Sequence, residues 1–431
     1  MWVRKRLDIG WSDLAFGVLR ACLPTDRPAI QRQVETSWSD ADNVLACLSV
    51  RSGFDLLLGA LELPQGSEVL MSAVTIRHMV ELVEQHGLVP IPVDLDIHRM
   101  APRVDLMRRA ITPATRAIVV AHLFGGRIEL EPILHLAAEH GLLVIEDCAQ
   151  AFAGTGYLGH PNADVSLFSF GPIKTATALG GALVRVRDRK LLQRMRAEQE
   201  RWPVQARRSY LLRLLKYAAL KALSSRPVYS ALMCAFGTIR YDPDHFVNGT
   251  VRGFTGPRLV VLLRRQPCAP LLAVLQRRLR KYDARRLEDR ASKGELLTRL
   301  LQEHVACPGA GAAGHTHWVF PILAADPRQA IALLGQSGFD ATQGQSLCVV
   351  AAPADRPQLE PRAAREALAK VVFLPFYPEM PTRAIRHLPR ALVGPCGELA
   401  SRANGGSALS LAAPVPAIKR RAGRAGSSGR D

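Results

Sequence analysis

The sequence predicts an α/β protein with a mostly parallel sheet covered by helices on both faces, followed by a smaller C-terminal α+β domain. Short apolar runs alternate with helical segments from about residue 56 to residue 145, and strands that alternate with helices are typical of parallel sheets. The chain has 431 residues, 48% of them hydrophobic, which is enough to bury a large core in two domains. A second group of apolar runs near residues 320 and 371 indicates the smaller domain.

The predicted elements follow one another in a regular order. The first 45 residues show weak periodicity, so they form either an arm that packs on a partner subunit or a loosely ordered leader. Helices are expected at 56–63, 79–86, 104–111 and 130–140, and strands at 68–71, 89–93, 117–121, 142–145 and 165–170. Several of these strands end in polar residues, and ligands of open α/β sheets bind at the carboxyl ends of strands. His122 follows one strand, where it either faces such a site or packs against a helix.

Composition limits the class of partner and the compartment. The formal net charge of +18 favours anionic partners, but no zinc finger or RNA-binding motif accompanies it, so we expect no specific nucleic acid. The eight cysteines are scattered without a CxxC pair, which indicates reduced thiols, with no zinc site and no disulfide framework. We find no signal-peptide pattern and no apolar run of membrane-spanning length. The expectation is a cytoplasmic protein without a metal.

The stretch from Leu142 to Gly181 carries the chemistry. Its first strand is followed by Asp147 and then Gln150, and its second strand carries Ser169 and is followed by Lys174. An acid, an amide, a hydroxyl and an amine at two strand ends suit pyridoxal phosphate. Lys174 would hold the cofactor's aldehyde and move the substrate proton, and Asp147 would keep the ring nitrogen protonated. Gln150 would contact the ring hydroxyl, and Ser169 a phosphate oxygen.

These residues stand in a recognisable pattern. EDCAQAF, followed by SFGPIK and the pair Gly180-Gly181, resembles the DegT/DnrJ/EryC1/StrS aminotransferases. The resemblance extends from about Val50 to Leu392, with an atypical middle from about 200 to 245. It implies a fold-type-I pyridoxal-phosphate enzyme that acts mainly on keto-sugars and cyclitols. It also implies a homodimer, because both chains contribute phosphate contacts in this family.

The same resemblance suggests further cofactor contacts. Ser52 and Gly53 match a turn whose amides bind the cofactor phosphate, while Phe54 replaces a threonine and keeps only the backbone amide. Ile76 stands where family members often carry an aromatic that packs near the ring. His78 would cover the ring instead, with a surface helix position as the alternative. Asn248 lies where the family places an asparagine that reaches the neighbouring subunit's cofactor phosphate.

Residues 200–240 form a basic insertion. The segment 205–223 interleaves Arg and Lys with leucines, which indicates an amphipathic helix. We expect one apolar face and an opposite basic face; the first carries Leu211, Leu214, Leu215 and Ala218, and the second Arg213 and Lys216. Two interpretations remain open. The helix either covers its own domain or dimer mate, or it lies on an anionic membrane or a lipid-linked substrate.

The C-terminal part repeats strands and helices on a smaller scale. A long connecting helix is expected at 270–301, strands at 316–323 and 371–374, and a helix at 328–337. His315 and His317 are candidates for substrate contact. The predicted divisions are an arm at 1–45, a cofactor-binding domain at 46–245, a connecting helix and small domain at 246–400, and a disordered basic tail at 401–431.

The resemblance and the four residues together predict an aminotransferase. The donor would be an amino acid, by analogy glutamate or glutamine, and the acceptor a keto-sugar or cyclitol. One alternative is another pyridoxal-phosphate reaction such as sugar dehydration, against which Lys174 argues, because family dehydratases lack the lysine. Another is an inactive cofactor-binding regulator, which the departures at Phe54, Ile76 and Leu179 permit.

Overall fold

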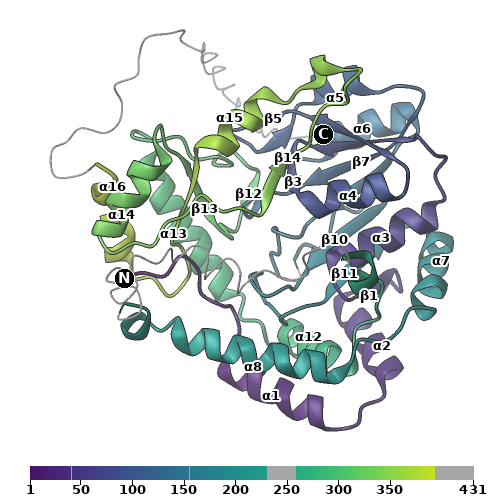
Figure 1. The fold of residues 1–431 in the computed structure, drawn as a ribbon, viewed down its shortest axis with the longest axis horizontal. Coiled ribbons are helices and arrows are strands. Elements are labelled where there is room, and N and C mark those ends of the chain that lie inside the picture. The colour runs from purple at the N-terminus through teal and green to yellow at the C-terminus, as the bar shows by residue number, and fades with distance from the viewer. Residues whose placement is uncertain (40, 155, 231–258, 394–431) are drawn as a thin grey trace, which may run out of the picture.

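The computed structural model of the chain describes residues 1–39, 41–154, 156–230 and 259–393 (Figure 1). In these residues, seven strands form the central sheet, in the order β1-β11-β10-β9-β7-β2-β4. They are β1 Val44–Cys47, β2 Glu68–Ser72, β4 Val89–Val93, β7 Thr115–Ala121, β9 Leu143–Asp147, β10 Val165–Ser169 and β11 Ala182–Val186. β11 runs antiparallel to both of its neighbours, and the other pairings are parallel.

Helices cover both faces of this sheet, as predicted. On β7, Ala117 and Val119 pack into one core and Ile118 and Val120 into another, because successive side chains of a strand point to opposite faces. The first core is covered by α3, α4 and α7, and the second by α5 and α6. Their bounds are α3 Val50–Leu61, α4 Arg77–Gln85, α5 Val104–Ala110, α6 Glu131–His140 and α7 Arg189–Glu200.

The N-terminal segment forms two helices that pack on the chain's own body. α1 (Trp11–Cys22) lies along α8 (Arg207–Leu223), and α2 (Arg27–Trp38) packs on α12 (Ala269–Lys281) (Figure 1). Ile30, Val34 and Trp38 recur every four residues on α2 and are buried. The expectation of a loosely ordered leader was therefore wrong. The short apolar stripe of α2 is hard to see in sequence because polar residues surround it.

The smaller domain is built around a two-stranded antiparallel sheet of β13 (Phe320–Leu323) and β15 (Val371–Leu374). Four helices surround it: α13 Arg285–Leu301, α14 Pro327–Gln336, α15 Arg362–Lys370 and α16 Thr382–Val393. The predicted connecting helix at 270–301 is divided into α12 and α13. The chain is extended at Tyr282, whose ring packs 5.5 Å from that of Phe152, and the carboxylate of Asp283 accepts the amide of Arg285 at the new helix start.

Short pairings join the two domains. β3 (Val74–Ile76) pairs with β14 (Leu347–Val349), and β8 (Gly126–Arg127) pairs with β12 (Gly314–His315). The remaining elements are the β5–β6 hairpin (Leu95–Asp96 and Ala101–Pro102), the 3-10 helix Pro357–Leu359 and α11 (Leu259–Leu263). The loop after β12 contacts the loops that follow β7 and β10, because the Thr316 amide donates to the Gly125 carbonyl and the Trp318 indole N–H to the Ile173 carbonyl.

Candidate active site

Asp147 and Ser169 end neighbouring strands at the carboxyl edge of the sheet. β9 and β10 pair in parallel, with Leu167 opposite Asp147, so Ser169 extends two residues beyond. The Asp147 Oδ1 atom accepts the backbone N–H of Ala149 at 2.9 Å. Burial raises the pKa of this carboxyl above its usual value, with Lys174 acting in the opposite direction. The acid is therefore held in a dry position, where a cationic partner would stabilise its charged form.

Lys174 comes to the same edge from the loop after β10. Its amide donates to the Gly171 carbonyl at 3.0 Å, and its Nζ lies 4.1 Å from the centre of the Trp318 ring. The indole N–H donates to the carbonyl of Ile173 at 3.0 Å, which fixes the ring. Burial lowers the pKa of Lys174 to about 8; Asp147 opposes that shift and Arg51 adds to it. The acid and the amine predicted from one stretch are thus close enough to influence each other.

Gln150 is held by a strained loop. Its Oε1 accepts the backbone N–H of Phe124 at 2.9 Å, which leaves the amide nitrogen as the group available to a ligand. Phe124 has a φ of 61°, a conformation that non-glycine residues rarely adopt. The adjoining Gly125 has no room for a side chain, because a Cβ there would meet the amide nitrogen of Trp318 at 2.4 Å. Ala176 and Leu179, in the loop after Lys174, also have positive φ. Such strain often concentrates at functional sites.

The predicted phosphate turn begins helix α3. Ser49 is the N-cap, and its Oγ accepts the amide of Ser52 at 3.1 Å, while the Gly53 amide donates to the Ser49 carbonyl at 3.0 Å. Gly53 packs against the sheet, where a Cβ would meet the Val184 Cγ2 at 2.6 Å. Phe54 is fully buried in the large-domain core. Within the protein, hydrogen bonds to Ser49 therefore use the amides of Ser52 and Gly53, and the core surrounds the side chain of Phe54. The cofactor contacts expected of these three residues stay predictions.

His78 is hydrogen-bonded to Arg51, a residue that the sequence analysis did not single out. Arg51, in the first turn of α3, donates through Nη1 to the His78 Nδ1 at 2.9 Å. Burial lowers the pKa of His78, and the charge of Arg51 lowers it further. The same charge acts on Lys174. A neutral imidazole can stack on an aromatic ring, so the predicted role of His78 is open. Asn248 lies outside the described residues.

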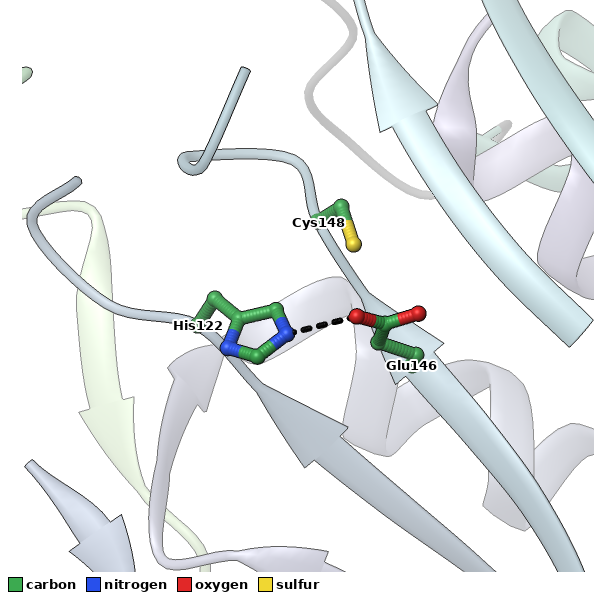
Figure 2. A group of neighbouring side chains, drawn as sticks. All are labelled: His122, Glu146 and Cys148. Atoms are coloured by element: carbon green, nitrogen blue, oxygen red, sulfur yellow. Dashed lines mark hydrogen bonds and ion pairs between the residues drawn. The ribbon is translucent and has the colours of Figure 1, made fainter. Parts of the chain in front are cut away.

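His122 faces away from this site. Its Nδ1 accepts the backbone N–H of Ile128 at 3.2 Å, so we assign the ring proton to Nε2, which donates to the Glu146 Oε1 at 2.8 Å (Figure 2). Glu146 precedes Asp147 in β9, and successive side chains of a strand point to opposite faces. His122 therefore does not face the candidate site, and its hydrogen-bond partners are Glu146 of β9 and the Ile128 amide instead of the helix of the alternative interpretation.

Glu146 is the centre of a buried hydrogen-bond network. Besides His122, its carboxylate accepts the Tyr157 hydroxyl, the Ser166 hydroxyl at 2.7 Å and the His160 amide at 2.9 Å. Burial alone would raise the pKa of Glu146, but these hydrogen bonds lower it to about 2. Ligand atoms of His122, Glu146 and Cys148 lie within 4.8 Å of one another (Figure 2). Their donors and acceptors are already used, so the described contacts make this group a structural network.

His315 and His317 stack on each other at the domain junction. Their ring centres are 3.8 Å apart, and His317 also packs 5.6 Å from Phe320. Burial lowers the pKa of His315 to about 4 and that of His317 to about 2. A Cβ at Gly294 would meet the His317 ring at 2.2 Å, so the ring fills the space over α13. This packing favours a structural role for His317 over the predicted substrate contact.

The basic insertion exposes only part of its predicted charged face, because Lys216 is exposed but Arg213 is half-buried. Tyr210, Leu214 and Tyr217 of α8 are buried, whereas Leu215 is half exposed. Arg213 turns inward and donates to the carbonyl of Leu179 at 3.2 Å, beside the loop that follows Lys174. Leu214 is buried as predicted, but Arg213 and Leu215 depart from the predicted division. The two tyrosines, which were not assigned to a face, are buried, and the Tyr210 hydroxyl donates to the Ala178 carbonyl at 2.8 Å.

The fold has many solved counterparts. The aminotransferase TlmJ from Streptoalloteichus hindustanus superposes with a TM-score of 0.64 at 17% identity, covering 91% of this chain and 98% of that one. PseC from Helicobacter pylori, an aminotransferase of pseudoaminic acid biosynthesis, gives 0.65 at 13% identity, covering 90% and 97%. NtdA from Bacillus subtilis, with bound cofactor PMP, gives 0.61 at 18% identity, covering 90% and 86%. The fold is that of the fold-type-I sugar aminotransferases.

The sequence comparisons match part of the chain to one family of aminotransferases. Residues 33–210 match the model of the DegT/DnrJ/EryC1/StrS aminotransferase family. A UDP-N-acetyl-3-dehydro-α-D-glucosamine 3-aminotransferase from Acidithiobacillus ferrooxidans is 37% identical over 159 residues, and a GDP-perosamine synthase from Escherichia coli O157:H7 is 34% identical over 169. These matches cover 35% and 38% of this chain, and 42% and 46% of the relatives. The chain thus spans less than half the length of the curated relatives it matches.

Proposed function

We propose that this protein is a pyridoxal-phosphate-dependent aminotransferase that moves an amino group from an amino acid to a keto-sugar or cyclitol. One observation carries the proposal: the half-buried Asp147 carboxylate and Lys174 amine lie at the carboxyl edge of the sheet, where the charge of each acts on the pKa of the other. Buried titratable groups with perturbed pKa values are typical of catalytic sites. The match of residues 33–210 to the family model and the sugar substrates in the names of the matched relatives support the acceptor class.

The residues fit the cofactor by their chemistry. Among the described side chains, none donates a hydrogen bond to the Asp147 carboxylate, so this buried acid is suited to a cationic ligand atom. Lys174 is an amine of lowered pKa, and Arg51 supplies positive charge at the start of α3, where helix amides also favour an anion. Asp147 would hold the ring nitrogen, Lys174 would hold the aldehyde, and Arg51 with the helix amides would hold the phosphate.

When bound, pyridoxal phosphate supplies an aldehyde that exchanges amines and a ring that accepts electrons from carbon. The protein's residues then have separate tasks. Asp147 holds a proton at the ring nitrogen, and the amide of Gln150 orients the ring. The Lys174 amine attaches the cofactor and afterwards carries a proton to and from the substrate carbon. Trp318 covers the lysine and excludes water from it.

The direct test replaces the lysine. Lys174→Ala should abolish the long-wavelength absorbance of the bound cofactor and all amine transfer from glutamate or glutamine, because no amine remains to attach the aldehyde. Lys190→Ala is the matched control, since Lys190 is exposed on α7. Mass spectrometry after borohydride reduction should find the cofactor on Lys174 only. Retention of absorbance and transfer by Lys174→Ala would refute the assigned role. Cofactor conversion without an aminated product would favour a regulator.

We also propose that the protein works as a homodimer in a reducing, cytoplasmic compartment. The resemblance supports the dimer, because family members share phosphate contacts between chains. The six cysteines found among the described residues are all free thiols, which supports a reducing environment.

Peripheral contact with an anionic membrane through α8 is a further proposal. The exposed leucines of α8 and its positive charge support it, as such a helix binds anionic lipid surfaces. None of the helices in the described ranges has both the length and the apolar character to cross a bilayer.

A further inference from the structure

The N-terminal arm brings a second lysine to the active site. Lys5 places its Nζ 3.6 Å from the centre of the Trp318 ring, the same indole against which the Lys174 Nζ lies at 4.1 Å. The two nitrogens are therefore no more than about 8 Å apart. Both residues line one pocket, which also includes Arg290 and Tyr377. Nothing in the sequence pattern pointed to Lys5, which lies 169 positions before Lys174.

The arm is fastened on both sides of Lys5. On one side, Arg4 forms a two-pronged ion pair with Asp340 of the smaller domain, through Nε at 2.9 Å and Nη2 at 2.7 Å. On the other side, the Asp8 carboxylate accepts the amide of Ala176 at 2.8 Å, two residues after Lys174. The position of Lys5 is thus fixed by contacts with both domains.

Within the part of the chain that the structure describes, the buried amine of Lys5 has no hydrogen-bond partner. Its Nζ is inaccessible to solvent and makes no hydrogen bond. The nearby acid, Asp8, already accepts the Ala176 amide and the Arg286 guanidinium at 3.1 Å. A buried, unpartnered amine costs free energy, and such groups in native proteins need an explanation. Burial and the charges of Lys174 and Arg290 lower the pKa of Lys5 well below its usual value. An anion bound here would remove that cost.

The position of the Lys5 amine relative to Lys174 suits the carboxylate of an amino-acid donor. In the proposed reaction the donor's nitrogen takes the place of the Lys174 amine. Covalent geometry puts the donor's carboxylate oxygens about 3 Å from that nitrogen, and a hydrogen bond to an ammonium spans about 3 Å more. The Lys5 Nζ lies no more than about 8 Å from the Lys174 Nζ, a range that includes the required separation of about 6 Å. The guanidinium of Arg290 is already bound to the Thr316 carbonyl and the Thr175 hydroxyl, at 2.6 and 3.1 Å.

We propose that Lys5 of the N-terminal arm binds the α-carboxylate of the amino-acid donor. This inference rests on the proposed aminotransferase function and assigns a donor-binding residue to it. Lys5 is a binding group and takes no part in proton transfer. Because a 2-oxo acid product carries the same carboxylate, Lys5 should bind donor and product alike.

The test measures the donor half-reaction in single-turnover absorbance experiments on the full-length, cofactor-loaded protein, with L-glutamate, or L-glutamine if it reacts faster. Lys5→Met should weaken the apparent donor affinity about tenfold to a hundredfold, as expected for loss of a charged hydrogen bond. It should weaken 2-oxo acid binding in the reverse half-reaction to a similar extent. Lys5→Arg should restore most of the affinity.

Arg6→Met serves as the matched control for loss of positive charge, because Arg6 is the neighbouring cation on the same arm and lines the same pocket, but its side chain is exposed and lies 5.8 Å from the Tyr377 ring. It should change donor affinity less than twofold. Thermal unfolding and cofactor affinity of each variant report the arm's integrity. An unchanged donor affinity in Lys5→Met overturns the proposal. So does an equal loss in Lys5→Met and Arg6→Met. If the unaltered protein converts no amino acid at all, the proposed function itself fails.

Discussion

At the scale of single residues, the site depends on how burial and neighbouring charges set the protonation of one lysine. Lys174 is surrounded by the Trp318 ring and by protein, and this desolvation disfavours its ammonium form. Asp147 favours the charged form, and Arg51 disfavours it. The result is an amine with a pKa of about 8, which is partly unprotonated near neutral pH and able to attack an aldehyde.

This balance predicts a pH dependence for aldehyde capture. With the pKa lowered from 10.5 to about 8, the free-amine fraction of Lys174 rises about tenfold per pH unit below 8 and levels off above it. The rate at which cofactor-free protein captures pyridoxal, which lacks the phosphate, should follow this curve in stopped-flow absorbance. Asp147→Asn should move the midpoint below 8, because the neutral amide no longer stabilises the ammonium. A midpoint near 10, or an upward shift in Asp147→Asn, would contradict this account.

At the scale of elements, helix α3 shows how close packing places the site. α3 lies so near the sheet that a Cβ at Gly53 would clash with the side chain of Val184 in β11. The close approach sets the start of α3, with Ser49 and Arg51, beside the ends of the strands that carry Asp147 and Ser169. The helix is anchored on its other side by Asp55, which bonds His86 and Arg264 at 2.8–3.0 Å.

The two glycines of α3 give a matched pair for testing this packing. Gly53→Ala should destabilise the protein by about 1–3 kcal/mol, because the new Cβ must displace Val184 or the helix. Gly59→Ala, on the exposed side of the same helix, should stabilise it by about 0.5–1 kcal/mol, because alanine has the better helix propensity. Denaturant unfolding measures both changes. Equal effects of the two substitutions would show that helix propensity, and not packing against β11, dominates.

At the scale of the whole molecule, the N-terminal segment and α8 form a layer that spans the body. Val3 belongs to the core of the smaller domain and Ile9 to a core of the larger one, so the arm crosses between the two. α1 and α8 then lie side by side and leave large apolar side chains in solvent. On α8, Leu212 is 57% exposed and Leu215 is 50% exposed. Exposed apolar residues gathered on one face mark an interaction surface.

Replacing these two leucines tests what the surface contacts. Leu212→Glu with Leu215→Glu should abolish sedimentation with anionic liposomes if α8 binds membrane, because the change removes apolar area and adds negative charge. The control is Gln329→Glu with Gln336→Glu, which adds the same charge on exposed positions of α14. Light scattering should read the dimer mass in both variants. A double-leucine variant that still sediments would contradict the membrane proposal, and one that becomes a monomer would assign the face to the subunit interface.

The order of strands and helices could be predicted from sequence, and so could the placement of the candidate site residues at neighbouring strand ends. Strands at 89–93 and 371–374 have the predicted bounds, because buried strands are short apolar runs between polar breaks. Asp147, Gln150, Ser169 and Lys174 lie within 28 consecutive residues, so two strand ends and a loop bring them together. Local pattern contains that information because parallel neighbouring strands end at the same edge.

Only the tertiary structure assigned Lys5, Arg51 and Trp318 to the site. Each is ordinary in its own sequence context, and Lys5 meets Trp318 across more than 300 positions of chain. The inward turn of Arg213 and the burial of Tyr210 were likewise decided by contacts with Leu179 and Ala178, which no helical projection includes. Periodicity describes the face that an element can present. The partner that covers this face, and the charges gathered beneath it, depend on packing between segments that are distant in sequence.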